Sequence, residues 1–200
     1  MRYFLFFAVI AFGSLASAQL ISVGAIGGVP TPNTSGTNNE SPPYTVGGSV
    51  EFHLPAGFSL EADALYRRLG DTSIAVYLSG SVLGSYTDRQ RGNAWEFPLL
   101  GKYYFRRTSA WQPFVGTGFA FETIGVHDVS NGFTNPFAAT AGSVVNNYRA
   151  PLEVGAVFAG GVRFHAGRFS ILPQVRYTRW GGTNVLTRNN ETSFLLGFAF

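Results

Sequence analysis

Hydrophobic and polar residues alternate one by one along most of the chain, which is the period of a β-strand with one apolar face. The clearest segment is 45–54, where Val46 and Phe52 fall on one side and Glu51 on the other. Glu beside Phe in strict alternation suits a strand better than a helix. The same alternation recurs in seven further segments. The eight predicted strands are residues 20–28, 45–54, 58–69, 95–105, 112–123, 152–164, 169–180 and 192–200.

The connections between these segments are long and short in turn. The long ones are residues 29–44, 70–93, 124–151 and 181–191, and the short ones are 55–57, 106–111 and 165–168. Barrels of the bacterial outer membrane have tight periplasmic turns and longer extracellular loops. The sequence therefore predicts an all-β fold, a closed up-and-down antiparallel transmembrane β-barrel of eight strands.

One long connection carries its own alternation. Ile74, Val76 and Leu78 alternate with smaller or polar residues, and Ser79-Gly80 follows as a candidate turn. This pattern predicts a hairpin within residues 72–87. The hairpin would either project above the membrane as a binding edge or add two strands to the wall, which would then have ten.

The apolar side of each strand is predicted to face lipid. Lipid cannot hydrogen-bond to the backbone, so a spanning sheet must close on itself. Ten residues in a tilted strand cover about 25 Å of apolar thickness. A soluble two-sheet sandwich has the same alternation, but its solvent face would be rich in Lys, Thr and Glu. Here the polar side carries Gly, Ser, Ala and few charges, as the interior of a narrow barrel would.

The first residues have the pattern of an export signal. Arg2 precedes a short apolar run, residues 3–12, and Ala16-Ser17-Ala18 has the small-x-small pattern of a cleavage site. The run is too short for a transmembrane helix, which needs about 20 residues. We expect a cleaved signal peptide over residues 1–18, one barrel domain over residues 19–200, and export to the outer membrane.

Composition narrows the class further. Only 12% of residues are charged, aromatics make up 16%, and cysteine is absent. Low charge with many aromatic and glycine residues departs from the soluble average. Of the 14 Lys and Arg residues, Arg2 is removed with the signal peptide. The remaining chain has 13 basic and 11 acidic residues, a net charge of +2. This small excess includes a single Lys and no basic run, so we expect no nucleic-acid partner.

The polar sides of the predicted strands carry charges of both signs. Unpaired charges in a narrow lumen would be costly, so we expect a network across it. Eight strands leave an interior that side chains roughly fill. A polar plug is therefore favoured over the alternative, a gated or leaky ion path. The predicted lumen charge network comprises Glu51, Glu61, Asp63, Arg67, Glu96, Lys102, Glu122, Glu153, Arg163 and Arg176.

Aromatic residues gather near the ends of the predicted strands. Amphipathic rings settle at the level of the lipid headgroups, so these residues are expected to form interfacial girdles. The predicted interfacial aromatics are Trp95, Tyr103, Trp111, Tyr177 and Trp180.

The last strand has the most specific pattern, with Phe194, Leu196, Phe198 and Phe200 at alternate positions up to the final residue. Together with the segments 96–105 and 113–118, it resembles the small outer-membrane barrel families. These are typified by the outer-membrane protein A transmembrane domain and by outer-membrane proteins X and W. The resemblance implies outer-membrane lipid as the surroundings. It also implies that the four residues act as an assembly signal for the barrel assembly machinery.

Candidate catalytic residues are few. The three histidines are His53, His127 and His165, and none lies in a His-x-Ser motif like that of the lipid A deacylase, a known barrel enzyme. Neither metal-ligand spacing nor a phosphate-binding loop is present. We expect no catalysis, cofactor or metal, and a structural or adhesive role in which the loops meet an unknown extracellular ligand. The alternatives are a small channel for ions or a narrow apolar solute, and a lipid-modifying enzyme.

Overall fold

The computed structural model describes residues 20–31, 44–79, 82–106, 109–134, 143–182 and 189–200. Within these ranges, side chains are described at all positions except 69–90, 127–146 and 148. The predicted signal peptide lies outside the described residues. Nine strands and one short 3-10 turn are present in the described part. The strands are β1 Ile21–Pro30, β2 Thr45–His53, β3 Phe58–Ser79, β4 Val82–Tyr104, β5 Trp111–Thr134, β6 Ser143–Arg149, β7 Glu153–Ala166, β8 Phe169–Trp180 and β9 Asn190–Ala199.

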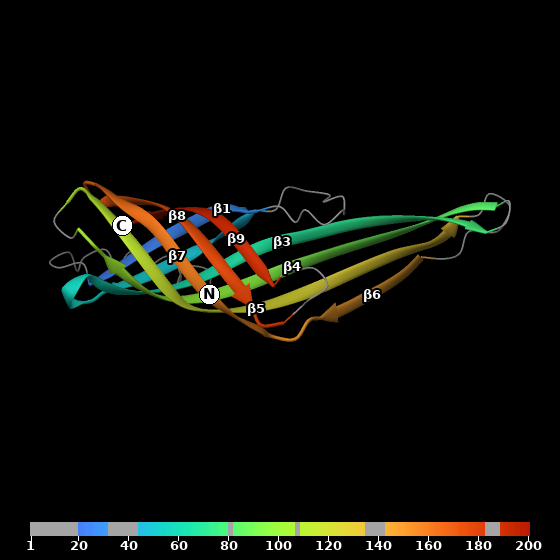
Figure 1. The fold of residues 1–200 in the computed structure, drawn as a ribbon, viewed down its shortest axis with the longest axis horizontal. Helices are drawn as coiled ribbons and strands as arrows, with labels where there is room; N and C mark the ends of the chain where they lie inside the picture. The colour runs from blue at the N-terminus through green and yellow to red at the C-terminus, as the bar shows by residue number, and fades with distance from the viewer. Residues whose placement is uncertain (1–19, 32–43, 80–81, 107–108, 135–142, 183–188) are drawn as a thin grey trace, which may run out of the picture.

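Eight of these strands close into an antiparallel barrel. Pairing runs from β1 through β5, then to β7, β8 and β9, and β9 returns to β1. The closing pair sets Gly24 opposite Ala199 and Pro30 opposite Ser193. Every wall strand has a partner on each side, as a lipid-embedded sheet requires. The predicted eight-stranded up-and-down barrel is confirmed (Figure 1).

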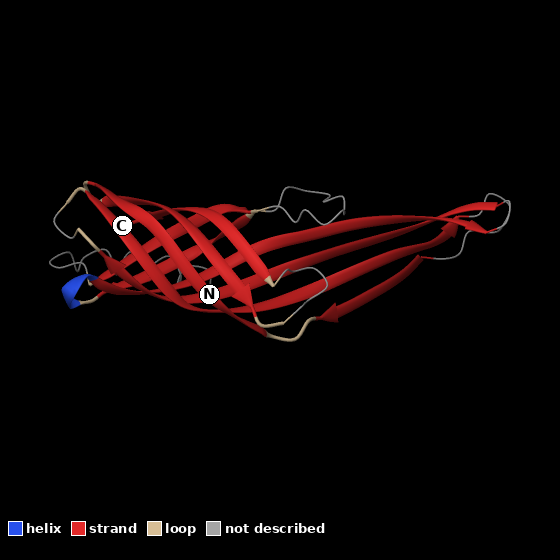
Figure 2. Ribbon diagram, in the orientation of Figure 1, coloured by secondary structure: helices blue, strands red, loops and turns tan. Residues whose placement is uncertain are grey.

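Four strands form a projecting sheet beyond the wall, made of the outer parts of β3, β4 and β5 together with β6. The β3–β4 pairing continues to Ser79 opposite Val82, and among the described strands β6 pairs with β5 alone, over residues 125–131. Figure 2 shows these strands running past the rest of the barrel. The predicted hairpin is part of this sheet and adds no strand to the wall.

The prediction of loops over residues 70–93 and 124–151 was wrong, because most of these residues lie in strands. The prediction ended each strand where the membrane-length pattern stopped. Beyond that point, backbone pairing with the neighbouring strands extends the ladder.

The opposite end of the barrel, here called the turn end, has short connections. A 3-10 turn over Pro55–Gly57 joins β2 to β3. Gly167 has a φ of 67° between β7 and β8, a left-handed conformation that glycine adopts without steric cost. No helix within the described ranges is long and apolar enough to cross a membrane.

Side chains alternate between an outward apolar face and an inward face, which holds the charged residues together with some apolar ones. On β9, Phe194, Leu196 and Phe198 are 54%, 41% and 54% exposed. On β8, Gln174 and Arg176 are buried. A soluble β-fold would place the large apolar side chains in its core. The predicted orientation, with the apolar side outward, is therefore confirmed.

Gly118 marks a place where β4 and β5 approach too closely for a side chain. A Cβ built there would overlap the backbone carbonyl of Leu99. We expect Gly118→Ala to push the strands apart and lower the free energy of unfolding by about 1–3 kcal/mol, the usual cost of overpacking. Urea unfolding in detergent micelles measures it. Gly125→Ala on the same strand is the control, since a Cβ there meets nothing within 4 Å. Equal midpoints for the two variants would contradict the expectation.

Candidate functional site

The lumen holds buried charges in three groups, and the group nearest the turn end is centred on Glu51. Ser59 Oγ and Tyr104 Oη donate to Glu51 Oε1 at 2.5 and 2.8 Å, and Arg163 pairs with Oε2. The Arg163 guanidinium also lies 4.7 Å from the centroid of the Tyr104 ring. These groups come from β2, β3, β4 and β7, so the cluster ties four strands together.

The middle group joins β3 and β4 to β8. Lys102 pairs with Glu61 Oε2, and Arg176 Nη2 lies 3.3 Å from Glu61 Oε1. Arg176 Nη1 lies 2.9 Å from Asp63 Oδ2. The Lys102 ammonium lies 4.6 Å from the centroid of the Phe114 ring. Since β3 and β8 are not neighbours in the wall, the Arg176 pairs cross the lumen.

The third group lies toward the projecting sheet and has one base among several acids. Arg67 pairs with Glu191 and lies 2.5 Å from Glu122 Oε1 and 3.9 Å from Glu96 Oε2. Ser193 Oγ donates to Glu191 at 3.2 Å. Arg67, which lies on β3, therefore binds carboxylates from β4, β5 and β9.

The structure places all ten predicted lumen charges inside the barrel. Nine lie in these three groups, and Glu153 also faces inward, from β7. Sequence reasoning missed Glu191, Tyr104 and Ser59. Each lies two positions from a lumen-facing residue and so has the same facing; strict use of the alternation would have found them.

This arrangement fills the barrel interior. Several of the bulkiest buried side chains are those of the ion pairs, Arg176 and Lys102 among them, together with Phe114 and Leu100. Paired charges that cross the lumen hold opposite walls at fixed separation. The lumen network thus has the form of a plug that joins the strands.

One trio at the turn end has the residue types of a hydrolase triad. Ser22 Oγ lies 2.8 Å from His53 Nε2, and His53 Nδ1 lies 3.9 Å from Glu51 Oε1. The second distance is beyond hydrogen-bond reach, and both Glu51 oxygens already bond to other groups. Arg163 Nη1 lies 3.3 Å from His53 Nε2, the nitrogen that faces Ser22. In this geometry the trio belongs to the lumen network and does not form a proton relay.

Of the other two histidines, only His165 has a described side chain. His165 Nδ1 lies 3.0 Å from Ser170 Oγ at the turn end, and the side chain of His127 lies outside the described set. Within the described residues, no group of three or more His, Asp or Glu side chains could hold a metal ion.

Four of the five predicted interfacial aromatics face outward: Trp95, Tyr103, Trp111 and Tyr177. The prediction for Trp180 was wrong. Its side chain is 2% exposed and packs inside the barrel, in a cluster with Leu100 and Phe114. The reason is its facing on β8: Trp180 is an even number of residues from Arg176 and shares its inward direction.

The predicted assembly residues Phe194, Leu196, Phe198 and Phe200 all face outward along the last strand. Phe200 exchanges backbone hydrogen bonds with Val23 of β1, next to the closure of the barrel. Their role in assembly stays a prediction.

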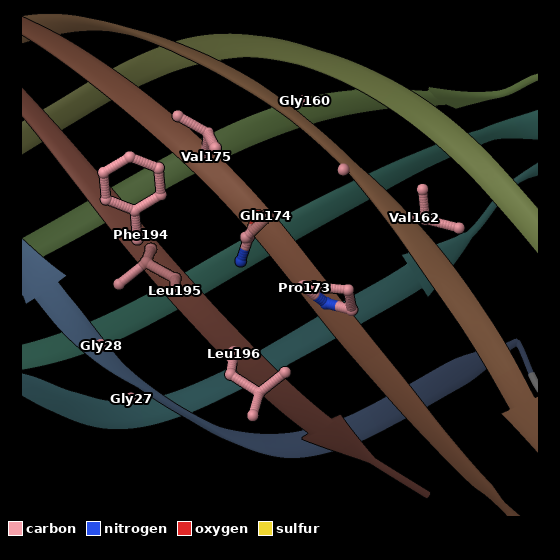
Figure 3. A pocket seen from close by; sticks show the side chains of 11 residues that line it. Gly27, Gly28, Gly160, Val162, Pro173, Gln174, Val175, Phe194, Leu195 and Leu196 are labelled. Atoms are coloured by element: carbon pink, nitrogen blue, oxygen red, sulfur yellow. The ribbon is translucent and has the colours of Figure 1, made fainter.

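A hollow lies on the outer wall, across β1, β9, β8 and β7 (Figure 3). Glycines at 27 and 160 leave its floor bare, while Val175, Phe194 and Leu196 stand around it. Its lining contains no charged or nucleophilic side chain. The hollow offers apolar contact to lipid and no catalytic chemistry.

No family model matches the sequence, and no curated protein matches it. Among solved structures, the chain is similar to Neisserial surface protein A, with 12% identity, a TM-score of 0.51, and coverage of 90% of this chain and 95% of that one. The N-terminal β-barrel domain of Pseudomonas aeruginosa OprF gives 14% identity, a TM-score of 0.46, and coverage of 92% and 98%. The outer membrane enzyme PagL gives 12% identity, a TM-score of 0.40, and coverage of 90% of this chain and 98% of that one.

A likeness at such low identity shows the fold alone, and one fold can host many functions. The closed wall of eight strands, the outward apolar face and the likeness to Neisserial surface protein A agree. The chain has the fold of the small bacterial outer-membrane β-barrels.

Proposed function

We propose that this chain is a non-catalytic outer-membrane protein that contacts a partner outside the cell through its projecting sheet. The proposal includes export with removal of residues 1–18. It also includes insertion into outer-membrane lipid by the barrel assembly machinery, acting on the last strand. The observation that carries it is the four-stranded sheet that continues beyond the wall.

The two edges of this sheet support a contact role. The pairing of β2 with β3 ends at Thr45 opposite Arg67, so in the described part of the chain the outer half of β3 has a partner only on its β4 side. In the same part, β6 pairs with β5 alone. Open strand edges present N–H and C=O groups that an extended segment of another protein can join.

Shortening the hairpin tests the proposal. A variant in which residues 72–87 are replaced by Asn-Gly keeps the wall strands and removes most of the projecting β3–β4 ladder. We compare bacteria that display the intact chain with bacteria that display the truncated variant. The first should adhere about tenfold better to at least one of laminin, heparin or polystyrene, because the truncation removes a main contact surface. Adhesion to immobilised surfaces is counted directly, and the heat-dependent shift in gel mobility shows that each variant is folded.

Envelope integrity is measured in the same strains as sensitivity to detergent. A truncation that weakens the envelope without changing adhesion would overturn the contact role and favour a structural role instead. If adhesion and detergent sensitivity are both unchanged, the proposal is overturned.

The channel alternative makes a different prediction. Because paired side chains fill the lumen, the purified protein should leave a planar lipid bilayer at baseline conductance, as expected of a narrow barrel. Steady discrete openings would contradict the plug and favour a channel. Altered acylation of lipopolysaccharide after incubation with the protein would instead favour the enzyme alternative.

A further inference from the structure

The turn end of the barrel carries basic side chains and no acidic ones in its connections. These connections are residues 54–57, 105–110 and 167–168. None of them contains Asp or Glu, and neither do residues 1–20, which precede β1. Arg106 lies between β4 and β5, Arg168 lies between β7 and β8, and both are exposed. We call these two arginines the basic rim.

The acid that lies closest to a turn along its own strand is not available to the basic rim. This residue, Glu51, is buried in the lumen, and both of its carboxylate oxygens accept hydrogen bonds there. On the adjoining strand, Glu61 and Asp63 are also buried and paired with lumen bases. The outward side of the turn end therefore has positive charge alone.

The two turns that carry the basic rim adjoin each other in the wall. They are linked through β5 and β7, which set Trp111 opposite Phe164. One residue nearer the turns, the His165 N–H donates to the Ala110 carbonyl at 2.9 Å. The two arginines therefore belong to one continuous part of the rim.

Aromatic side chains set the depth of the basic rim in the membrane. The Arg106 guanidinium carbon lies 4.5 Å from the centroid of the Trp111 ring, within the range of a cation–π contact. Trp111 faces outward, and Phe105 and Phe169, the neighbours of the two arginines in sequence, are exposed. Girdles of such rings mark the boundary between hydrocarbon and headgroups. The ring contact thus holds the Arg106 charge at headgroup level.

A guanidinium at this depth meets the phosphates of lipid headgroups. Guanidinium groups form paired hydrogen bonds with phosphate oxygens. Basic side chains beside a membrane surface also attract anionic lipids, over about one Debye length. The apolar outer wall begins directly beside the basic rim, so a ligand that fits both has acyl chains as well as a negative headgroup.

We propose that the basic rim binds the headgroup phosphate of an anionic phospholipid. In the orientation of the proposed function, the turn end faces the inner leaflet of the outer membrane. The inference rests on the membrane location and not on the adhesive role. The hairpin truncation that tests adhesion leaves both arginines in place, so the two ideas can fail separately.

Native mass spectrometry of the detergent-purified chain tests this with four probes: phosphatidylglycerol, phosphatidylcholine, inorganic phosphate and a hexaglutamate peptide. Phosphatidylglycerol should bind the intact chain best. The double variant Arg106→Gln/Arg168→Gln should weaken that binding about thirtyfold, as expected for the loss of two basic residues at an anionic surface. The matched control is Arg68→Gln/Arg149→Gln, which removes the same charge from exposed positions at the other end of the barrel and should leave binding unchanged.

A further variant leaves both arginines in place. Ala110 is exposed in the same turn as Arg106, so Ala110→Glu puts a carboxylate into the basic rim. Phosphatidylglycerol should bind this variant about tenfold more weakly, because the new charge offsets one arginine. Ala110→Gln adds a side chain of similar size without charge and should bind like the intact chain. The heat-dependent gel shift confirms folding of each variant.

The proposal is overturned if the two double variants bind phosphatidylglycerol alike, or if phosphatidylcholine binds the intact chain equally well. Equal binding of inorganic phosphate would show that acyl chains do not matter and would overturn a lipid as the ligand. Tighter binding of hexaglutamate than of phosphatidylglycerol, lost in Arg106→Gln/Arg168→Gln, would also overturn it and assign the basic rim to an acidic protein.

Discussion

Replacing Arg67 with methionine is expected to lower the free energy of unfolding by about 3–5 kcal/mol, the cost of breaking a buried ion pair from one side. Methionine fills much of the same space but carries no charge. Three carboxylates, those of Glu96, Glu122 and Glu191, would lose the guanidinium that they share. The midpoint of urea unfolding in phospholipid vesicles without lipopolysaccharide measures the loss.

The next residue in the chain is the matched control. Arg68 faces outward and is exposed, so Arg68→Met should change the free energy of unfolding by no more than about 0.5 kcal/mol, as for most surface substitutions. Equal effects at the two neighbouring positions would contradict the assignment of faces.

A double variant tests whether the loss comes from uncompensated charge. Glu122 contacts Arg67 at 2.5 Å, so adding Glu122→Gln to Arg67→Met removes one of the stranded carboxylates. The double variant should be more stable than the sum of the two single effects predicts, because residues in contact do not behave additively. Simple additivity would show that packing, rather than charge, explains the loss.

The second large effect is expected on the outside of the wall. Leu99 lies on β4 between the outward aromatics Tyr103 and Trp95 and is 47% exposed. Leu99→Arg should lower the free energy of unfolding in phospholipid vesicles by about 2–4 kcal/mol, because a charge there enters hydrocarbon. In a soluble β-fold, an exposed position would accept arginine with little change.

Depth along the same strand supplies the control. Asn93 is outward-facing and exposed on β4, beyond Trp95, beside the native Arg68. Asn93→Arg should therefore cost only about 0–1 kcal/mol, the value near the interface. A Leu99→Arg cost as small as that at Asn93 would show that this face does not contact lipid.

The alternation of side chains was enough to predict most of the wall. Apolar and polar residues largely alternate along each wall strand, and burial has the same period of two on β8 and in the second half of β9. Ten lumen charges could be predicted because period two is a local property of the chain. Trp180 was misplaced because its residue type was given more weight than its position in the alternation.

The extent of the strands could not be predicted in the same way. The outer parts of β3, β4 and β5 lie beyond the membrane-length pattern, where pairing with neighbours, rather than contrast between two faces, maintains the strand. The partners within the lumen network could not be predicted for a related reason. The members of each ion pair are far apart in sequence, and only the closure and register of the wall bring them together.

By itself, the sequence determined the number of wall strands, the side of each that faces lipid and the charges that enter the lumen, because these follow from the order of residues within one strand. The tertiary structure alone decided which acid meets which base and how far the sheet projects. Those features depend on the stagger between strands, which long-range pairing fixes and no single segment encodes.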